Sequence, residues 1–301
     1  MNKILEFSAE VAAAIEKQRP IVALESTIIS HGMPYPQNVE TAKRLEELVR
    51  SEGAIPATIC LMDGKIKIGL SDSELELLAT ADDVKKISRR DMASCLATKS
   101  IGATTVAATM IAANLAGIRV FATGGIGGVH RYAEESFDIS ADLIEFSRTP
   151  VIVVAAGVKA ILDIPKTLEY LETYGVPVLG YQTDIFPAFY SVESNSPVQK
   201  INSAAEIAEI YQQTENLHFN NGMIIANPIP RKYESPFDEM SLHIEVALAE
   251  AKGKQIVGQA VTPFLLSKLV ELTQGRSLKT NIHLVENNVR LASKIAVELG
   301  K

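Results

Sequence analysis

Glu25 and Lys159 are the side chains whose setting in the sequence most strongly suggests catalysis. Each follows an apolar run typical of a buried strand, IVAL at residues 21–24 and VIVVAA at residues 151–156. Ligands of α/β sheets bind at the carboxyl ends of the strands, so both side chains stand where a substrate would bind. An apolar setting favours the protonated form of a carboxyl group, as a general acid requires. A glutamate that hydrogen-bonds a neighbouring loop is the alternative interpretation.

Lys159 lies in the segment Gly157-Val158-Lys159-Ala160, just before a helical pattern. Partial burial and a nearby helix N-terminus both disfavour an ammonium ion, and a neutral amine is the form that attacks a carbon electrophile. The segment therefore suggests covalent amine chemistry. A surface lysine in the first turn of a helix remains the simpler alternative.

A glycine-rich loop follows the strand-like run RVFAT at residues 119–123. Residues 124–131 read GGIGGVHR, in which backbone amides could approach an anion closely and His130 and Arg131 could add charge. The spacing matches neither a P-loop nor a dinucleotide fingerprint. Asp138 and Asp142 come next, and they could bind a hard cation or simply cap a helix.

The densest basic cluster is Lys85-Lys86-Ile87-Ser88-Arg89-Arg90, in a chain that is acidic as a whole. Such a cluster is either a solvated face or the receiver of a phosphorylated substrate. Two further segments, Asn227-Pro228 and Lys279-Thr280-Asn281, place amides where they could fix the polar edge of a ligand, although turn chemistry explains Asn-Pro equally well.

The elements that would position these residues alternate between short apolar runs and helical periodicities. Such alternation predicts an α/β fold, a three-layer α/β/α arrangement with a mixed, mostly parallel sheet, in one catalytic domain over residues 1–301. Two α/β halves are the alternative. Asp63-Gly64 between two strand-like runs predicts a hairpin, and Ser203 with Glu206 has the spacing of a capping box. The N-terminal segment MNKILEFSAEVAAAIEK is expected to form an amphipathic helix, not a signal peptide.

Composition narrows the functional classes. The chain has 301 residues, 47% of them hydrophobic, a formal net charge of −7 and a pI near 5.4. These values exclude intrinsic disorder and make coating of DNA or RNA an unlikely role, while a local basic pocket is compatible with them. Two cysteines without metal-ligand spacing exclude a disulfide scaffold or a structural zinc site, and no apolar run is long enough for a membrane span. A soluble cytoplasmic protein is expected.

The chain resembles the pseudouridine-5′-phosphate glycosidase family, also called indigoidine synthase A-like. The segments that resemble the family extend over nearly all of the sequence: ALESTIISHGMPYPQN (23–38), SRRD (88–91), GATTVAATM (102–110), FATGGIGGVHR (121–131), FDISADL (137–143), GYQT (180–183), ANPIP (226–230) and TPFLL (262–266). The resemblance implies an α/β/α homotrimer that reversibly cleaves pseudouridine 5′-phosphate to uracil and ribose 5-phosphate, with one manganese ion per subunit.

The resemblance also implies roles for individual residues. It places the nucleophile on Lys159, the proton donor on Glu25, and the metal-binding aspartate on Asp138, where the ion keeps mostly water ligands. The positions that resemble substrate contacts are Lys86, the backbone near Val106, Ser140, Ala141 and Asp142, together with His130 and Asn281 for the phosphate and the uracil. For Asp142 we hypothesise that its carboxylate gives a proton to the base or removes one from it.

Two other functions compete with this one. A Schiff-base phosphosugar lyase of the aldolase type would also use a desolvated lysine, but it would have no use for uracil. A non-catalytic accessory protein of a pigment pathway, suggested only by the alternative family name, would tolerate loss of Lys159. Neither alternative predicts uracil as a product.

Overall fold

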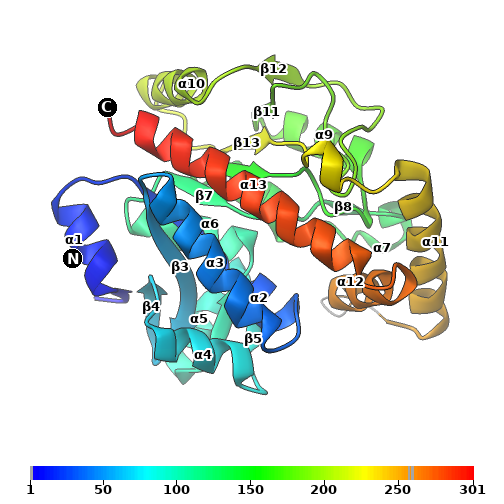
Figure 1. The fold of residues 1–301 in the computed structure, drawn as a ribbon, viewed down its shortest axis with the longest axis horizontal. Coiled ribbons are helices and arrows are strands. Elements are labelled where there is room, and N and C mark those ends of the chain that lie inside the picture. Colours follow the sequence, from blue (N-terminus) through cyan, green and yellow to red (C-terminus); the bar gives the residue numbers. More distant parts are fainter. Residues whose placement is uncertain (1–2, 257, 259–260) are drawn as a thin grey trace.

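Short apolar runs form the strands of a central mixed sheet. A computed structural model describes residues 3–256, 258 and 261–301 of the protein, and Figure 1 shows the sheet at its centre. Within these residues the sheet is formed by β1 Leu5–Phe7, β2 Ile21–Leu24, β3 Ile55–Met62, β4 Lys65–Ile68, β5 Lys85–Ile87, β6 Gly102–Thr104, β7 Val120–Ala122, β9 Ile152–Ala155, β11 Val178–Tyr181, β12 Gln199–Ile201 and β13 Met223–Ala226. A separate small ribbon pairs β8 Val129–His130 with β10 Leu162–Asp163.

The sheet order is β1-β4-β3-β2-β7-β9-β13-β11-β12, with β6 paired to β3 and β5 paired to β6. All neighbours from β3 through β12 along this order are parallel, whereas β3 pairs antiparallel with β4 and with β6. The Asp63-Gly64 hairpin between β3 and β4 and the mixed, mostly parallel sheet are therefore confirmed.

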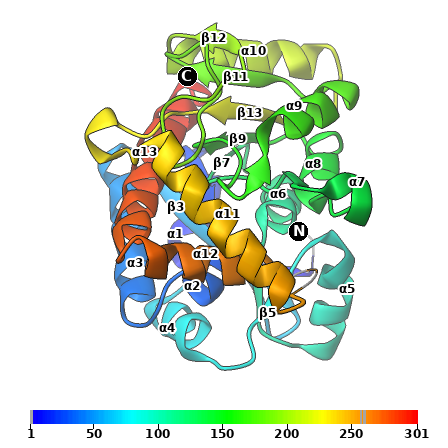
Figure 2. The ribbon, with the colours of Figure 1, turned by 90° about the vertical axis from the view of Figure 1, so that its right-hand side faces the viewer.

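Helices cover both faces of the sheet. The helices are α1 Ala9–Glu16, α2 Thr27–His31, α3 Gln37–Ser51, α4 Asp72–Thr80, α5 Arg89–Thr98, α6 Val106–Leu115, α7 Ala133–Ser136, α8 Ala141–Phe146, α9 Ile164–Thr173, α10 Ala204–Asn216, α11 Phe237–Gly253, α12 Val261–Leu272 and α13 Arg276–Glu298, with a 3₁₀ turn at Arg231–Tyr233. Helix α13 runs diagonally across one face in Figure 1, packed against α3 and α10, and Figure 2 shows α5, α6, α8 and α9 on the other side. Within the described residues, no helix is both long and apolar enough to cross a membrane.

The core explains why the central strands carry so few polar residues. All four residues of β9 and of β13 are buried, because helices cover both faces of these strands. Along β2, β7, β9 and β13 polar side chains therefore appear only after the strands end. Helices α11 and α12 lie in front of the sheet in Figure 2, and Thr262 of α12 contacts the space beyond the strand ends.

Three local expectations need correction. The N-terminal segment is not one helix, because residues 5–7 pair in parallel with β4 and only then does Ser8 cap α1. The helix expected from residue 160 begins at Ile164, because Leu162 and Asp163 pair with β8 and Asp163 is the N-cap of α9. Ser203 caps α10 through the amide of Glu206, but the Glu206 carboxylate bonds the amide of Asn202, so the capping box is incomplete.

Candidate active site

Two adjoining cavities open at the carboxyl ends of the central strands. The first cavity has a volume of about 430 Å³, which is adequate for a phosphosugar, and it is lined by charged and polar residues that include Lys86, Arg90 and Asp138. The second cavity is smaller and is lined by Glu25, Asn281 and several apolar side chains. Residues common to the two linings are Thr27, Lys86, Lys159 and Thr262. Lys159 therefore stands where the two cavities meet.

Glu25 follows β2 and lies on the wall of the second cavity. Its side chain is 8% exposed, and its two carboxylate oxygens accept hydrogen bonds from the hydroxyls of Thr27 and Thr123. Both hydroxyls can also act as acceptors, so they can hold the carboxyl group in its charged form or in its protonated form. This arrangement fixes the orientation of the carboxyl group and leaves it able to transfer a proton.

Lys159 reaches the cavities from a tight bend after β9. Gly157 makes that bend with a φ of +92°, and a Cβ atom there would collide with the carbonyl oxygen of Pro187. The amide of Lys159 then donates to the carbonyl of Ile126, 3.0 Å away. Because α9 begins only at Ile164, its N-terminus is not next to Lys159, and the expected influence of that helix dipole on the amine is not supported.

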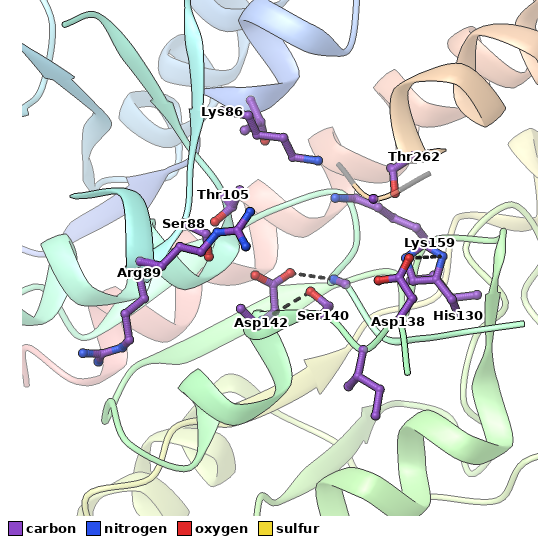
Figure 3. A pocket seen from close by; sticks show the side chains of 17 residues that line it. Lys86, Ser88, Arg89, Thr105, His130, Asp138, Ser140, Asp142, Lys159 and Thr262 are labelled. Carbon is purple, nitrogen blue, oxygen red and sulfur yellow. Dashed lines mark hydrogen bonds and ion pairs between the residues drawn. The ribbon is translucent and has the colours of Figure 1, made fainter. Parts of the chain in front are cut away.

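The second lysine of the site, Lys86, places a positive charge near Lys159. Figure 3 shows the side chains of Lys86 and Lys159 directed toward one another from opposite sides of the cavity. Burial lowers the pKa of Lys86, and the nearby Lys159 ammonium lowers it further, while Asp142 and Glu25 oppose the change. Two amines that share one partly desolvated space cannot both be charged without cost unless an anion lies between them.

The other cations of the basic cluster have different partners. Arg89 makes a bidentate ion pair with Glu145 at 2.6 and 2.7 Å, and Glu145 is fully buried. Lys85 donates to Ser100 at 2.9 Å, and Arg90 pairs with Asp91 at 3.4 Å while lining the first cavity. The cluster is thus not a uniform solvated face: Lys86, Arg89 and Arg90 all line the first cavity, and Arg89 also ties the start of α5 to α8.

Asp142 connects three segments of the site. Its carboxylate accepts from the amide of Ala107, 2.9 Å away in the first turn of α6, and from the amide of Gly127 at 2.8 Å. A Cβ atom on Gly127 would lie 2.6 Å from Oδ2 of Asp142, so this glycine is required for the close approach. Each carboxylate oxygen keeps a further lone pair, so these hydrogen bonds orient Asp142, and its hypothesised proton transfer with the base stays a prediction.

The glycine-rich loop forms part of the wall of the site, and two of its backbone amides are already hydrogen-bonded within the protein. The amide of Gly127 is bound to Asp142, and the amide of Ile126 donates to the carbonyl of Gly157 at 3.1 Å. Ser140 and Ala141 line the first cavity at the start of α8, and Val106 begins α6 directly after Thr105, its N-cap, which also lines this cavity. Ser140 and Ala141 therefore border the first cavity, whereas Val106 is buried next to a lining residue.

His130 and Asp138 stand together at the other side of the first cavity. Nδ1 of His130 lies 3.8 Å from Oδ2 of Asp138, and the amide of His130 donates to the Asp138 carbonyl at 3.0 Å (Figure 3). Burial lowers the pKa of His130, with smaller contributions of the same sign from Lys86 and Lys159 and an opposing one from Asp138. A neutral imidazole beside a half-exposed carboxylate can bind a cation or a hydroxyl group.

Sequence reasoning did not identify several residues of the site. Thr27 and Thr123 hold the Glu25 carboxyl group, and Phe189, Leu266 and Pro263 form the apolar part of the second cavity. Thr27 and Thr123 carried a weak signal, since each closely follows a strand-like run. Nothing in the local sequence around Phe189 or Leu266 indicated that these residues would meet at the site.

The chain is similar to known proteins of one family. The family model described as indigoidine synthase A like protein matches residues 10–298. Proteins named pseudouridine-5′-phosphate glycosidase are similar over the whole chain: that of Caldanaerobacter subterraneus subsp. tengcongensis is 56% identical, covering 100% of this chain and 98% of the relative, and that of Geobacillus kaustophilus is 57% identical, covering 100% of both.

Two solved structures are also similar. The prealnumycin C-glycosynthase in complex with ribulose 5-phosphate has a TM-score of 0.93 at 39% identity, covering 100% of this chain and 98% of that one. An indigoidine synthase A-like protein from Thermotoga maritima has a TM-score of 0.91 at 38% identity, covering 99% and 97%. The molecule bound in the first of these structures, ribulose 5-phosphate, is a sugar phosphate.

Proposed function

The chain belongs to the indigoidine synthase A-like family, and we propose that it is a pseudouridine-5′-phosphate glycosidase. In this proposal it reversibly cleaves the C–C bond between ribose and base, giving uracil and ribose 5-phosphate. The observation that carries the proposal is that Lys159 and Glu25 line one cavity, with Lys159 shared by a cationic space and a more apolar one. The names of the full-length relatives support the same activity.

The two cavities suggest how the substrate lies. The phosphate and ribose occupy the first cavity, near Lys86 and Arg90, and the base occupies the second, between Phe189 and Asn281. An aromatic ring can stack on a pyrimidine, and the amide of Asn281 can pair with the polar edge of uracil. The C1′ atom that joins ribose to base then lies at the junction, within reach of Lys159.

The reaction begins when the amine of Lys159 attacks C1′. The C1′–O4′ bond breaks, and the ring oxygen takes a proton from Glu25, which opens the sugar. A C–C glycosidic bond offers no leaving oxygen, so the usual pair of carboxylates of a glycosidase would not serve. Glu25, now a carboxylate, accepts the proton that the nitrogen loses.

The base leaves in the next step. The lone pair on nitrogen forms the C1′=N bond of an iminium, the electrons of the C1′–C5 bond remain with the base, and C5 takes up the proton that Glu25 has just accepted, which gives uracil. Water then hydrolyses the iminium, which releases ribose 5-phosphate and restores the Lys159 amine, and the proton set free in this step returns to Glu25. One water molecule is consumed in the cycle, and no oxidant or reductant is needed.

The decisive experiment incubates the purified protein with pseudouridine 5′-phosphate and manganese and follows free uracil by chromatography. We expect uracil and ribose 5-phosphate in equal amounts. In the reverse direction we expect ribose 5-phosphate to be consumed only when uracil is added, which an aldolase-type lyase would not require. The proposal is contradicted if the forward assay releases no uracil and the reverse assay shows no uracil-dependent consumption of ribose 5-phosphate.

Lys86 is the side chain that we expect to bind the phosphate. Lys86→Ala should raise KM for pseudouridine 5′-phosphate about 10- to 100-fold, because a charge-assisted hydrogen bond is lost. Lys85→Ala is the matched control, since the Lys85 amine bonds Ser100 on the surface. Kinetics with pseudouridine and with its 5′-phosphate measure the effect. If Lys86→Ala prefers the phosphorylated substrate as strongly as wild type, another group binds the phosphate.

A manganese ion at Asp138 is part of the proposal. Within residues 3–256, 258 and 261–301 no three His, Cys, Asp or Glu side chains form a metal cluster. A single carboxylate with the His130 imidazole nearby fits an ion that keeps most of its water ligands. When bound, such an ion would supply positive charge beside the anionic sugar phosphate.

Asp138→Ala should therefore raise the manganese concentration needed for half-maximal activity by tenfold or more, since the loss of an outer-shell partner alone costs a metal site about 10- to 100-fold in affinity. Asp238→Ala, at an exposed position in the first turn of α11, serves as the control. Activity is measured after chelation and stepwise addition of manganese. An unchanged metal requirement in Asp138→Ala would contradict this metal site.

The assembly is also a proposal. We infer the homotrimer that the family resemblance implies, acting as a single catalytic domain per subunit in the cytoplasm. Exposed apolar side chains that could be covered by another copy lie near the mouth of the first cavity and on α11: Phe137 is 84% exposed and Leu242 70%.

A further inference from the structure

Asn288, on the inner face of α13, is a buried polar residue that the proposed reaction does not use directly. Its side chain is fully buried. Its amide nitrogen donates to the carbonyl of Thr123 at 2.8 Å and to the carbonyl of Gly124 at 3.4 Å, while its oxygen accepts from the side-chain nitrogen of Asn227 at 3.0 Å. Only this orientation of the amide satisfies all three partners.

These hydrogen bonds connect the ends of neighbouring strands. Asn227 follows β13, and its backbone N–H donates to the carbonyl of Ala155 at the end of β9. Thr123 and Gly124 follow β7, which lies between β2 and β9 in the sheet. Through Asn288, helix α13 is therefore fixed to the edge of the sheet at which the second cavity opens.

Thr123 and Gly124, whose carbonyls accept from Asn288, belong to the side of the site that we assign to the base. The hydroxyl of Thr123 donates to the Glu25 carboxylate, so the position of the Thr123 backbone sets one of the two hydrogen bonds of the proton donor. Gly124 lines the second cavity, and a Cβ atom placed on it would lie 3.2 Å from Oδ1 of Asn281. Asn281 and Asn288 are seven residues apart on α13 and therefore share one face of the helix.

We propose that Asn288, supported by Asn227, is a positioning residue that sets the register of α13 against the strand ends and thereby holds Asn281 and Glu25 in place for the base. The proposal rests on the proposed function, because it assigns the second cavity to uracil. The phosphate side of the site depends on other segments, namely β5, the β8 segment and the start of α8. Loss of Asn288 should consequently affect the two halves of the substrate unequally.

The test measures synthesis from uracil and ribose 5-phosphate. Asn288→Ala should raise KM for uracil and lower kcat by about tenfold each, because two carbonyls and the Asn227 amide lose their buried partner. KM for ribose 5-phosphate should stay within about twofold of wild type. Trapping of ribose 5-phosphate on Lys159 with borohydride, read as a mass increase of the peptide, should also stay at the wild-type level.

Asn227→Ala should act in the same direction with a smaller effect, about threefold, because it leaves the contacts of Asn288 to the strand ends.

Ser293→Ala is the matched control, since Ser293 is fully buried on the same helix but bonds only the Val289 carbonyl of that helix, at 2.8 Å. The positioning role is contradicted if both asparagine variants match Ser293→Ala. It is equally contradicted if the KM for ribose 5-phosphate and the trapping change as much as the KM for uracil, which would indicate general loosening. Should Asn288→Ala fail to fold by circular dichroism, Asn227→Ala decides. A wild-type protein that neither releases uracil nor forms the adduct contradicts the proposed function instead.

Discussion

Lys159→Ala is expected to fold as the wild-type protein does and to lose roughly a thousandfold or more in kcat. The proposed path forms a covalent bond between the Lys159 amine and C1′, and a methyl group removes that path altogether. Lys159 is partly exposed on a cavity wall, so its truncation should leave the core intact. Uracil release under saturating substrate measures the loss, and borohydride with ribose 5-phosphate should label wild type but not the variant.

Two further variants make this result specific. Lys159→Arg keeps a positive charge near the phosphate but offers no nucleophilic amine, so it should be as inactive as Lys159→Ala. Lys166→Ala, at an exposed lysine that pairs with Glu134 at 2.8 Å, should retain wild-type activity. A Lys159→Ala protein with a tenth of the wild-type rate would exclude Lys159 as the nucleophile.

Glu25→Gln should lower kcat by about 10²- to 10⁴-fold, the usual contribution of a general acid–base catalyst, while KM changes little. The amide has the shape of the carboxylate, and the Thr27 and Thr123 hydroxyls can each donate to it or accept from it, so the local structure is preserved. The variant lacks a proton that it can give to the ring oxygen. Steady-state kinetics of uracil release separate kcat from KM.

Glu46→Gln is a matched control for that variant. Glu46 is also a largely buried glutamate that accepts from a threonine hydroxyl, Thr58 at 2.6 Å, but it lies on α3 away from both cavities. It should retain wild-type kcat. Equal kinetics for Glu25→Gln and Glu46→Gln would mean that another group protonates the sugar.

The strands were the most predictable part of the fold. Buried runs such as IVAL and VIVVAA become β2 and β9 with nearly the expected bounds, because a central parallel strand must be apolar on both faces. The position of Glu25 and Lys159 beyond these strands followed from the same pattern. Helix α4 was not predicted, although the sequence held its signal: Ser71 and Glu74 form a complete capping box.

The relations between distant residues were not predictable from the residues alone. The influence of Lys159 on Lys86, the ion pair of Arg89 with Glu145 and the attachment of Asp142 to α6 each join segments from different parts of the chain. Local pattern shows that a side chain ends a strand but not which side chain it will meet. The start of the N-terminal helix was wrong for a similar reason, since residues 5–7 form a strand only through their pairing with β4, while residues 9–16 are helical as expected.

The junction at Lys159 separates two spaces that are lined from different parts of the fold. The first cavity is lined largely by β5, the segment before α8 and the starts of α5 and α8, whereas much of the second is contributed by α2, α12 and α13. Substitutions at Pro263 and Leu266, on a helix other than the one that Asn288 anchors, should reshape the second cavity while the strand ends keep their partners. Such modularity makes the scaffold a starting point for engineered C-nucleotide synthesis, in which the same pentose donor is joined to other carbon nucleophiles.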